Sequence, residues 1–172
     1  MRSYDMKRII VGIILLSFLA TPANAILAKY WRLHVLMGSA MESLVYNDGG
    51  VISVRCSPWK FTSGALVYGT TIVDDMGHDA GETLAADASS EGDVNDNTSN
   101  LYLGIKGYFT VIADTAATGT VYLYLEESDD NTNWPSDADA DEFDVAEDCI
   151  FLCALALSSD AVDEGRGKNF EF

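Results

Sequence analysis

A short acidic run between residues 137 and 148 carries the side chains with the plainest chemical potential in this sequence. Asp137, Asp139 and Asp141 stand at alternate positions, and Asp148 closes the run. Oxygen ligands at this kind of spacing coordinate calcium in loop sites. The sixth position is Glu142, where a calcium loop needs glycine for its sharp turn, and the last ligand is not a bidentate glutamate. Two interpretations therefore stand, a solvated acidic loop, which the sequence favours, and a calcium-stabilised turn.

Aromatic side chains just before this run point to a second chemistry, which is binding. Tyr122 and Tyr124 alternate with apolar residues, and Trp134 follows at the adjacent turn. Exposed aromatic rings stack on sugars or act as hot spots of protein interfaces. The alternative is structural: a subunit or a loop covers the two tyrosines, and Trp134 closes the end of a hairpin. Exposure decides between the two.

Catalytic chemistry has little support in the sequence. His34 and His78 are the only histidines, and no nucleophile motif accompanies either of them. Carboxylates are numerous, but nothing in the sequence marks one as buried with a raised pKa. We therefore expect a protein that is not an enzyme.

The three cysteines leave two alternatives open. Cys56 can pair with Cys149 or Cys153 across a core, or all three can be buried thiols that act as small apolar side chains. Cys149 and Cys153 lie too far apart on one strand to bridge each other. A zinc site is poorly supported, because neither the cysteines nor the histidines show ligand spacing. We expect no cofactor, with calcium in the acidic run as the one exception to test.

Composition and charge set limits on partners. The chain has 172 residues, 48% of them hydrophobic, which is enough for one ordinary core. Ten basic and 27 acidic residues give a net charge of −17, and from residue 41 onward five basic residues stand against 26 acidic ones. A surface of this kind repels phosphate backbones and anionic lipids, so nucleic-acid binding is not expected. It suits solubility and docking onto a basic protein surface.

The N-terminal segment has the pattern of a secretory leader. Basic residues precede an apolar run at 9–20, and the small-x-small ending at Ala25 suits a signal peptidase. Two alternatives remain: an uncleaved anchor, which would be the only membrane contact, and translation from Met41, where the charge balance changes. We predict a signal peptide-like segment at 1–25, a linker at 26–42 and an acidic domain at 43–172. An exported location, periplasmic or extracellular, follows if the leader is used.

Strands are predicted to position the candidate side chains. Residues 51–56 alternate, and we expect Pro58 to end that strand because proline donates no ladder hydrogen bond. Further strands are predicted at 65–73, 101–113, 120–126, 149–157 and 169–172, and the continuously apolar 149–157 is expected to be central. Residues 74–100 are expected to be a mobile loop or to hold a short helix around 81–87. Two glycines inside 101–113 predict a bulge or a close backbone contact.

The fold class predicted from these elements is all-β. About six to eight strands would form an antiparallel β-sandwich or jelly roll, preceded by an N-terminal hydrophobic helix of the leader type. Alternation in the strand at 120–126 predicts two sets of side chains. The core-facing set is Val121, Leu123 and Leu125, and the outward set is Thr120, Tyr122, Tyr124 and Glu126.

Residues 121–134 and 160–172 resemble segments of β-sandwich structural proteins of tailed-bacteriophage virions. The first segment is an apolar strand that ends in Ser128, Asp130 and a turn closed by Trp134. The same turn is similar to the Asp-box hairpin of sialidase-like proteins, although it lacks the glycine of that motif and is one residue short. The phage resemblance implies a capsid- or tail-associated structural or decoration protein located in the virion. It also implies protein partners or self-association in an oligomer or lattice, without catalysis.

Two functional hypotheses follow from the sequence. The first is the virion structural or decoration protein, which would bury the Tyr122 and Tyr124 face against a partner and would tolerate loss of residues 1–40. The alternative is an exported module that binds carbohydrate or another surface through Tyr122, Tyr124 and Trp134, with calcium in support. The position of the mature N-terminus, at Ile26 or at Met41, distinguishes the two.

Overall fold

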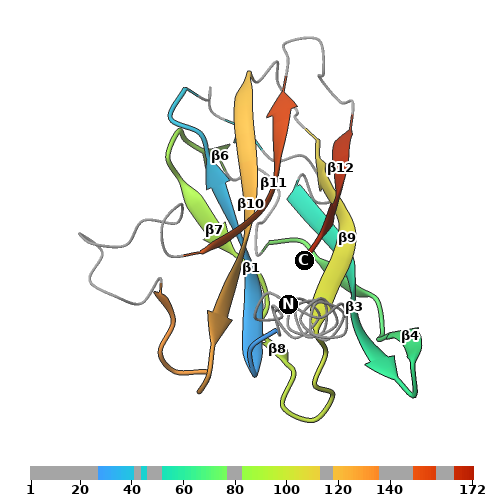
Figure 1. Ribbon diagram of the computed structural model, residues 1–172. Coiled ribbons are helices and arrows are strands. Elements are labelled where there is room, and N and C mark those ends of the chain that lie inside the picture. The colour runs from blue at the N-terminus through green and yellow to red at the C-terminus, as the bar shows by residue number, and fades with distance from the viewer. Residues whose placement is uncertain are drawn as a thin grey trace, which may run out of the picture.

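The computed structural model describes residues 27–40, 44–45, 52–76, 83–112, 118–135, 149–157 and 165–172, with only the backbone described at 44–45 and 83–84. The regular structure of these residues is made of twelve strands (Figure 1). All strand pairs are antiparallel. The predicted all-β class is confirmed, whereas the predicted N-terminal helix lies outside the described residues.

The first sheet is built around β1 (Tyr30–Met37) and β10 (Gly119–Ser128), which pair along eight residues. Its strand order is β11-β10-β1-β7, with β11 at Ile150–Leu157 and β7 at Ser89–Glu91. A short strand, β8 (Asn95–Asp96), also pairs with β1. β1 therefore lies in the middle of this sheet, with β10 on one side and the two short strands β7 and β8 on the other.

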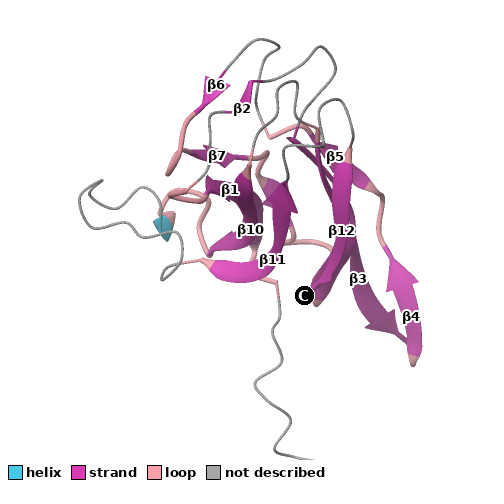
Figure 2. Ribbon diagram, turned by 90° about the horizontal axis from the view of Figure 1, so that it is seen from above, coloured by secondary structure: helices cyan, strands magenta, loops and turns pink. Residues whose placement is uncertain are grey.

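The second sheet is built around β3 (Ile52–Thr62) and β9 (Gly104–Val111). Its order is β12-β9-β3-β4, with β12 at Arg166–Glu171 and β4 at Ala65–Tyr68, and β5 (Ile72–Asp74) also pairs with β3. The separate pair β2 (Leu44–Val45) and β6 (Thr83–Leu84) completes the set. The two large sheets face each other (Figure 2), an arrangement consistent with a β-sandwich.

One hydrophobic cluster fills the space between the two sheets. Alternate residues of each strand point inward, as strand geometry requires. The predicted core residues Val121, Leu123 and Leu125 are fully buried in it, so that prediction is confirmed. The other members come from both sheets and include Leu33, Val35, Ile52, Val54, Ile105, Phe109, Cys153 and Phe170.

The prediction of a linker at 26–42 is wrong for residues 30–37. These residues form β1, and Trp31, Leu33, Val35 and Met37 belong to the core. The charge change at residue 41 suggested a domain boundary there, but charge composition says nothing about which segment completes a sheet. The expected tolerance to losing residues 1–40 is therefore also wrong, because a chain that starts at Met41 would lack the strand that joins β10 to β7 and β8.

The prediction that Pro58 ends the strand is also wrong, because β3 continues to Thr62. Cys56 pairs with Ile72 of β5 on one side, and Trp59 pairs with Tyr68 of β4. Pro58 lies between these two pairings, where β3 changes partner, and its carbonyl accepts a hydrogen bond from Gly69 N at 2.8 Å. The missing N–H therefore removes no bond from the β9 side of the strand.

The described part of the long acidic stretch is neither a loop throughout nor a helix. Residues 83–100 carry β6, β7 and β8. Two polar side chains hold this stretch in place. Asp74 accepts hydrogen bonds from Met76 N and Asp93 N, both at 2.8 Å, and buried Asn97 donates to Leu27 O and Tyr102 O, both at 3.1 Å. Such side-chain bonds to backbone replace the apolar periodicity that sequence reasoning depends on.

Three smaller differences concern strand edges and number. The strand at 149–157 was expected to be central, but β11 stands at the end of the first sheet, and its Ile150 and Phe151 are exposed. The single strand expected at 65–73 is two strands, β4 and β5, and short strands raise the two sheets to five members each. The glycine prediction is confirmed as close contact, because a Cβ on Gly107 would meet Arg55 O at 2.5 Å.

Candidate functional site

The outer face of the first sheet holds the aromatic residues predicted to bind. The structure favours the covered alternative: Tyr124 is 6% exposed, Trp134 is 7% exposed, and Tyr122 is half-buried. Tyr124 packs edge-on against Phe151, with ring centroids 5.7 Å apart, and lies 6.4 Å from the ring of Tyr122. The predicted outward orientation of these side chains is correct, since they lie opposite the core-facing set, but the face is covered.

Trp134 contributes to the cover by stacking on an arginine. The guanidinium carbon of Arg32 lies 4.4 Å from the Trp134 ring centroid, within cation–π distance. Arg32 itself stands on β1 opposite Glu126 of β10. The structural alternative for Trp134, closure of the hairpin end, therefore describes its position better than an exposed binding residue does.

A buried group of charges lies beneath this tryptophan. Arg32 Nε is 2.5 Å from Glu126 Oε2, and Arg32 Nη1 is 2.7 Å from Glu91 Oε2. His34 Nδ1 is 3.8 Å from the same Glu126 oxygen. Glu126 belongs to the predicted outward set and lies on the outer face, but it is fully buried there. Burial of a carboxylate requires a partner charge, and the Arg32 guanidinium supplies it.

Three members of this group are spaced as metal ligands would be. One ligand atom each from His34, Glu91 and Glu126 lie within 4.8 Å of one another. However, the Arg32 guanidinium already binds both carboxylates and occupies the position of the positive charge. We interpret the group as a structural ion-pair network that joins β1, β7 and β10. Sequence reasoning missed it because its residues come from three segments separated by 35 to 94 positions, and only the β1 register brings them together.

The turn after β10 is built by side-chain hydrogen bonds. Asp130 Oδ1 accepts from Thr132 N at 2.9 Å and from Asn133 N at 2.8 Å, and Ser128 Oγ donates to Asn133 O at 2.8 Å. The bonds that Asp130 accepts lower its pKa to about 2, with the Asn133 backbone bond as the largest cause. Ser128 and Asp130, whose pattern is similar to an Asp box, thus shape this turn. The turn places Trp134 against Arg32.

The remaining predicted site residues either fall outside the described part of the chain or are cysteines. His78 lies outside the described residues. So do the acidic residues proposed for calcium, which are Asp137, Asp139, Asp141 and Asp148. All three cysteines are buried, and no disulfide joins them, so the alternative of buried thiols is the correct one. Burial is the main cause that raises the pKa of Cys56 to about 12, and burial also raises the pKa of Cys153.

The outer face of the second sheet, in contrast, has side chains that are exposed to solvent. Large apolar and aromatic side chains are exposed there, and strand register places them on one face. We call these residues the second-sheet patch: Phe61, Leu66, Tyr68, Val73 and Tyr108. Exposed patches of this kind on a protein surface mark interaction sites. The β3–β4 hairpin that carries three of them extends from the body of the molecule (Figure 1).

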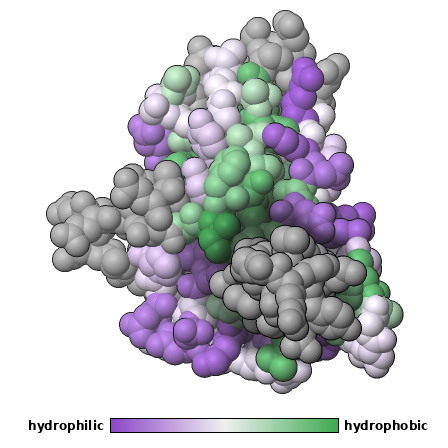
Figure 3. Space-filling model, viewed as in Figure 1, coloured by the Kyte–Doolittle hydropathy of each residue, from purple (hydrophilic) through white to green (hydrophobic). Residues whose placement is uncertain are grey.

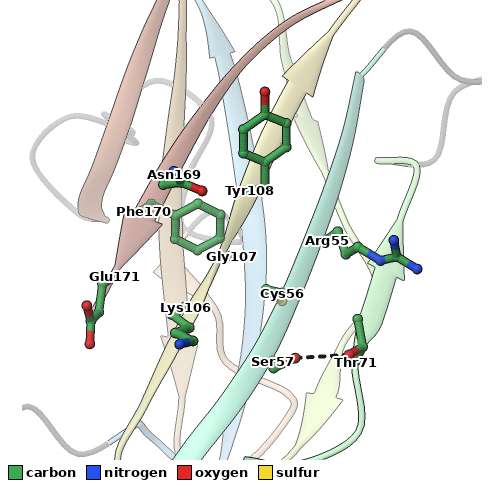
Figure 4. Close-up of a pocket in the computed structure, with 10 residues that line it drawn as sticks. All are labelled: Arg55, Cys56, Ser57, Thr71, Lys106, Gly107, Tyr108, Asn169, Phe170 and Glu171. Atoms are coloured by element: carbon green, nitrogen blue, oxygen red, sulfur yellow. Dashed lines mark hydrogen bonds between the residues drawn. The ribbon is translucent and has the colours of Figure 1, made fainter.

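A hollow of about 430 Å³ opens on the same face (Figure 4). Lys106 and Tyr108 of β9 stand beside Asn169 and Glu171 of β12, and Arg55 lies on the β3 side. The Tyr108 ring rests over Gly167 of β12, since a Cβ at that glycine would lie within 2.1 Å of the tyrosine hydroxyl. The glycine thus lets the aromatic ring lie close to the sheet.

Lys106 borders the hollow and is held by an aromatic neighbour. Its Nζ lies 4.3 Å from the Tyr68 ring centroid. A hydrogen bond to Tyr68 is the largest cause that raises the pKa of Lys106, and Glu171 adds to it. The lysine therefore stays charged at neutral pH. Sequence reasoning missed this site, although alternation in 101–113, which sets Lys106 and Tyr108 opposite Ile105 and Phe109, was a usable signal.

Comparison with known proteins does not assign this site. No protein-family model, curated protein or solved structure matches the chain. Within the described part of the chain, no helix is long and apolar enough to cross a membrane.

Proposed function

We propose that this chain is a non-enzymatic structural or decoration protein of a phage-like virion that acts through protein–protein contacts. The observation that supports the contact role is the second-sheet patch. Phe61, at 60% exposed, and Leu66 stand on a hairpin whose second strand is exposed at all four positions. Exposed aliphatic and aromatic side chains on one face suit a protein partner, because burying them on association removes apolar area from water.

The virion setting rests on the resemblance of residues 121–134 and 160–172 to phage β-sandwich proteins. A complete sandwich or jelly roll on this pattern would join a protein lattice through its outer faces. The leader-like segment at 1–25 would instead send the chain out of the cell. A measured mature N-terminus at Ile26 would count heavily against the virion setting.

A surface-binding module is the second candidate, and one observation favours it. Tyr108, 44% exposed, lies against Gly167 with Asn169 and Glu171 beside it, an arrangement that suits stacking on a sugar ring. Here Tyr108 replaces Tyr122, Tyr124 and Trp134 as the binding aromatic. Retention on polysaccharide gels that Tyr108→Ala abolishes would support this candidate over protein contact.

Sedimentation analysis tests the proposed contact role. The double variant Phe61→Ser/Leu66→Ser should weaken self-association, or association with a virion partner, because it removes apolar area from the hairpin. Val94→Ser/Leu101→Ser is the matched control, since both of these apolar residues are exposed away from the patch. Equal association of the two double variants and the unsubstituted chain would overturn the proposal.

A further inference from the structure

Beyond residue 40, the lysines and arginines of this chain are confined to one sheet. Beyond residue 40 the sequence holds five basic residues, and all five lie on strands of the second sheet: Arg55, Lys60, Lys106, Arg166 and Lys168. Arg55 and Lys106 are exposed and line the hollow on the outer face. In a protein of net charge −17, this face is where an anionic partner meets cations.

Negative charge is concentrated in a different part of the chain. Residues 119–149 contain eleven acidic residues and no lysine, arginine or histidine. Seven of the eleven lie at 136–148, together with Phe143 and Val145. The described residues stop at Pro135, just after Trp134 stacked on Arg32 of β1, and resume at Cys149, which packs with Tyr124 of β10.

Exposed apolar side chains continue from the end of that acidic segment. Ile150 and Phe151 open β11 and are exposed. Hydrophobic surface gathers in the middle of Figure 3, where Figure 1 places β11. The chain therefore exposes apolar side chains in two places, on β11 next in sequence to the acidic segment, and on the second sheet beside Arg55 and Lys106.

We infer that the hollow on the second sheet binds the acidic segment 136–148 of a second copy of this chain. Carboxylates of the segment would meet Arg55 and Lys106, and its Phe143 would pack against the second-sheet patch. Charge-assisted hydrogen bonds to lysine and arginine are stronger than neutral ones, so this pairing selects the acidic segment over uncharged chain.

The two surfaces differ, so the contact is head-to-tail. A contact of this type produces closed rings or, where the rotation does not close, filaments with one surface open at each end. This inference rests on the proposed function, because it names the partner of the same surface. It adds a direction of assembly and a segment that supplies the contact.

A synthetic peptide with the sequence of residues 136–148 provides the first test. Fluorescence anisotropy should show that it binds the full chain, and that Arg55→Glu/Lys106→Glu weakens binding at least about tenfold, the loss expected for two charge-assisted contacts. Lys29→Glu/Lys168→Glu changes net charge equally at two residues that do not line the hollow, and should change binding less than about twofold. Equal effects of the two double variants would overturn the inference.

Mixing two variants gives a second test that depends on the head-to-tail arrangement. One chain carries Arg55→Glu/Lys106→Glu, and the other carries Asp141→Asn/Glu142→Gln/Asp144→Asn. Each alone should fail to associate in sedimentation, whereas the mixture should form dimers only, since one intact basic face meets one intact acidic segment. Absence of dimers in the mixture would overturn the inference. If Phe61→Ser/Leu66→Ser still abolished association in that case, the proposed function would stand without it.

Discussion

On the outer face of the first sheet, Tyr124 is buried under its neighbours, whereas on the outer face of the second sheet Tyr108 is 44% exposed. Both tyrosines stand on long strands, alternate with core residues and have charged side chains nearby. The two faces differ in whether other parts of the chain cover them. Trp134 lies over Arg32 on the first sheet, while the second sheet keeps an open hollow. Alternation identifies an outer face, but only the path of the connecting chain decides whether that face can bind.

The charges on the two faces follow the same division. On the first sheet Glu126 is buried and pairs with Arg32, so removal of either charge alone should destabilise the fold. On the second sheet Arg55 and Lys106 line an accessible hollow, so their charges are open to a partner. The first face is thus a place where substitution should damage folding, and the second a place where it should damage association.

Removal of residues 27–40 should have the largest effect on folding. These residues include β1, which pairs with β10 along eight positions and supplies four residues to the core. We expect a chain that starts at Met41 to lose cooperative urea unfolding, followed by tryptophan fluorescence. A chain that starts at Ile26 should keep it. Cooperative unfolding of the shorter chain would show that the first sheet forms without its middle strand.

Glu126→Ala should destabilise the fold next most strongly, by about 3–5 kcal/mol, because it leaves the Arg32 charge buried without its main partner. Glu171→Ala, on the outer face of the second sheet, is the matched control, with an expected change within about 0.5 kcal/mol. Urea unfolding measures both. Arg32→Met/Glu126→Leu should recover most of the loss, since apolar residues of similar volume often replace a buried ion pair. Similar losses for Glu126 and Glu171 would contradict the comparison of the two faces.

Substitution of the two tyrosines gives the most direct test that the first outer face is covered and the second is exposed. Tyr124→Ala should lower the free energy of unfolding by about 3 kcal/mol through the cavity it leaves. Tyr108→Ala should lower it by less than about 1 kcal/mol, as expected for a partly exposed position. The order should reverse in sedimentation, where Tyr108→Ala weakens association and Tyr124→Ala does not, provided that the folded fraction is matched. Equal unfolding free energies would mean that the first face is not covered in solution.

The sequence predicted correctly the strands whose inward-facing residues are apolar and whose outward-facing residues are polar. It did not predict strands that bury polar residues on their outer side. Val121, Leu123 and Leu125 were predicted correctly because burial on one side produces strict alternation. β1 was missed because the charge change at residue 41 suggested a boundary there, and because Arg32 and His34, buried on its outer side, interrupt its apolar residues. Contacts between β1, β7 and β10 depend on register over long sequence separations, which a local pattern does not contain.

Thiol chemistry tests whether the hollow of the second sheet stops short of the core. Cys56 lies under the hollow, and burial raises its pKa to about 12, above the ordinary 9.0. The folded state therefore holds the thiol proton more tightly, and stability should fall as pH rises from about 9 toward about 12. Thermal unfolding against pH measures this slope, which Cys56→Ala should reduce. A rapid reaction of Cys56 with a thiol reagent in the folded protein near neutral pH would show that the hollow reaches the core.

The smallest expected effect concerns the turn that carries Trp134 over the first sheet. Hydrogen bonds from Asn133 N and Thr132 N hold the pKa of Asp130 near 2, below its ordinary 3.8. Its contribution to stability is present above pH 4 or so and is lost as pH falls toward about 2. Asp130→Asn should therefore lower stability at neutral pH and flatten the acid limb of the stability curve, while Asp129→Asn, an equal change of charge, should leave that limb intact. Because Trp134 covers Arg32 only through this turn, its fluorescence should report greater solvent exposure in Asp130→Asn, and unchanged fluorescence would mean that other contacts hold the cover in place.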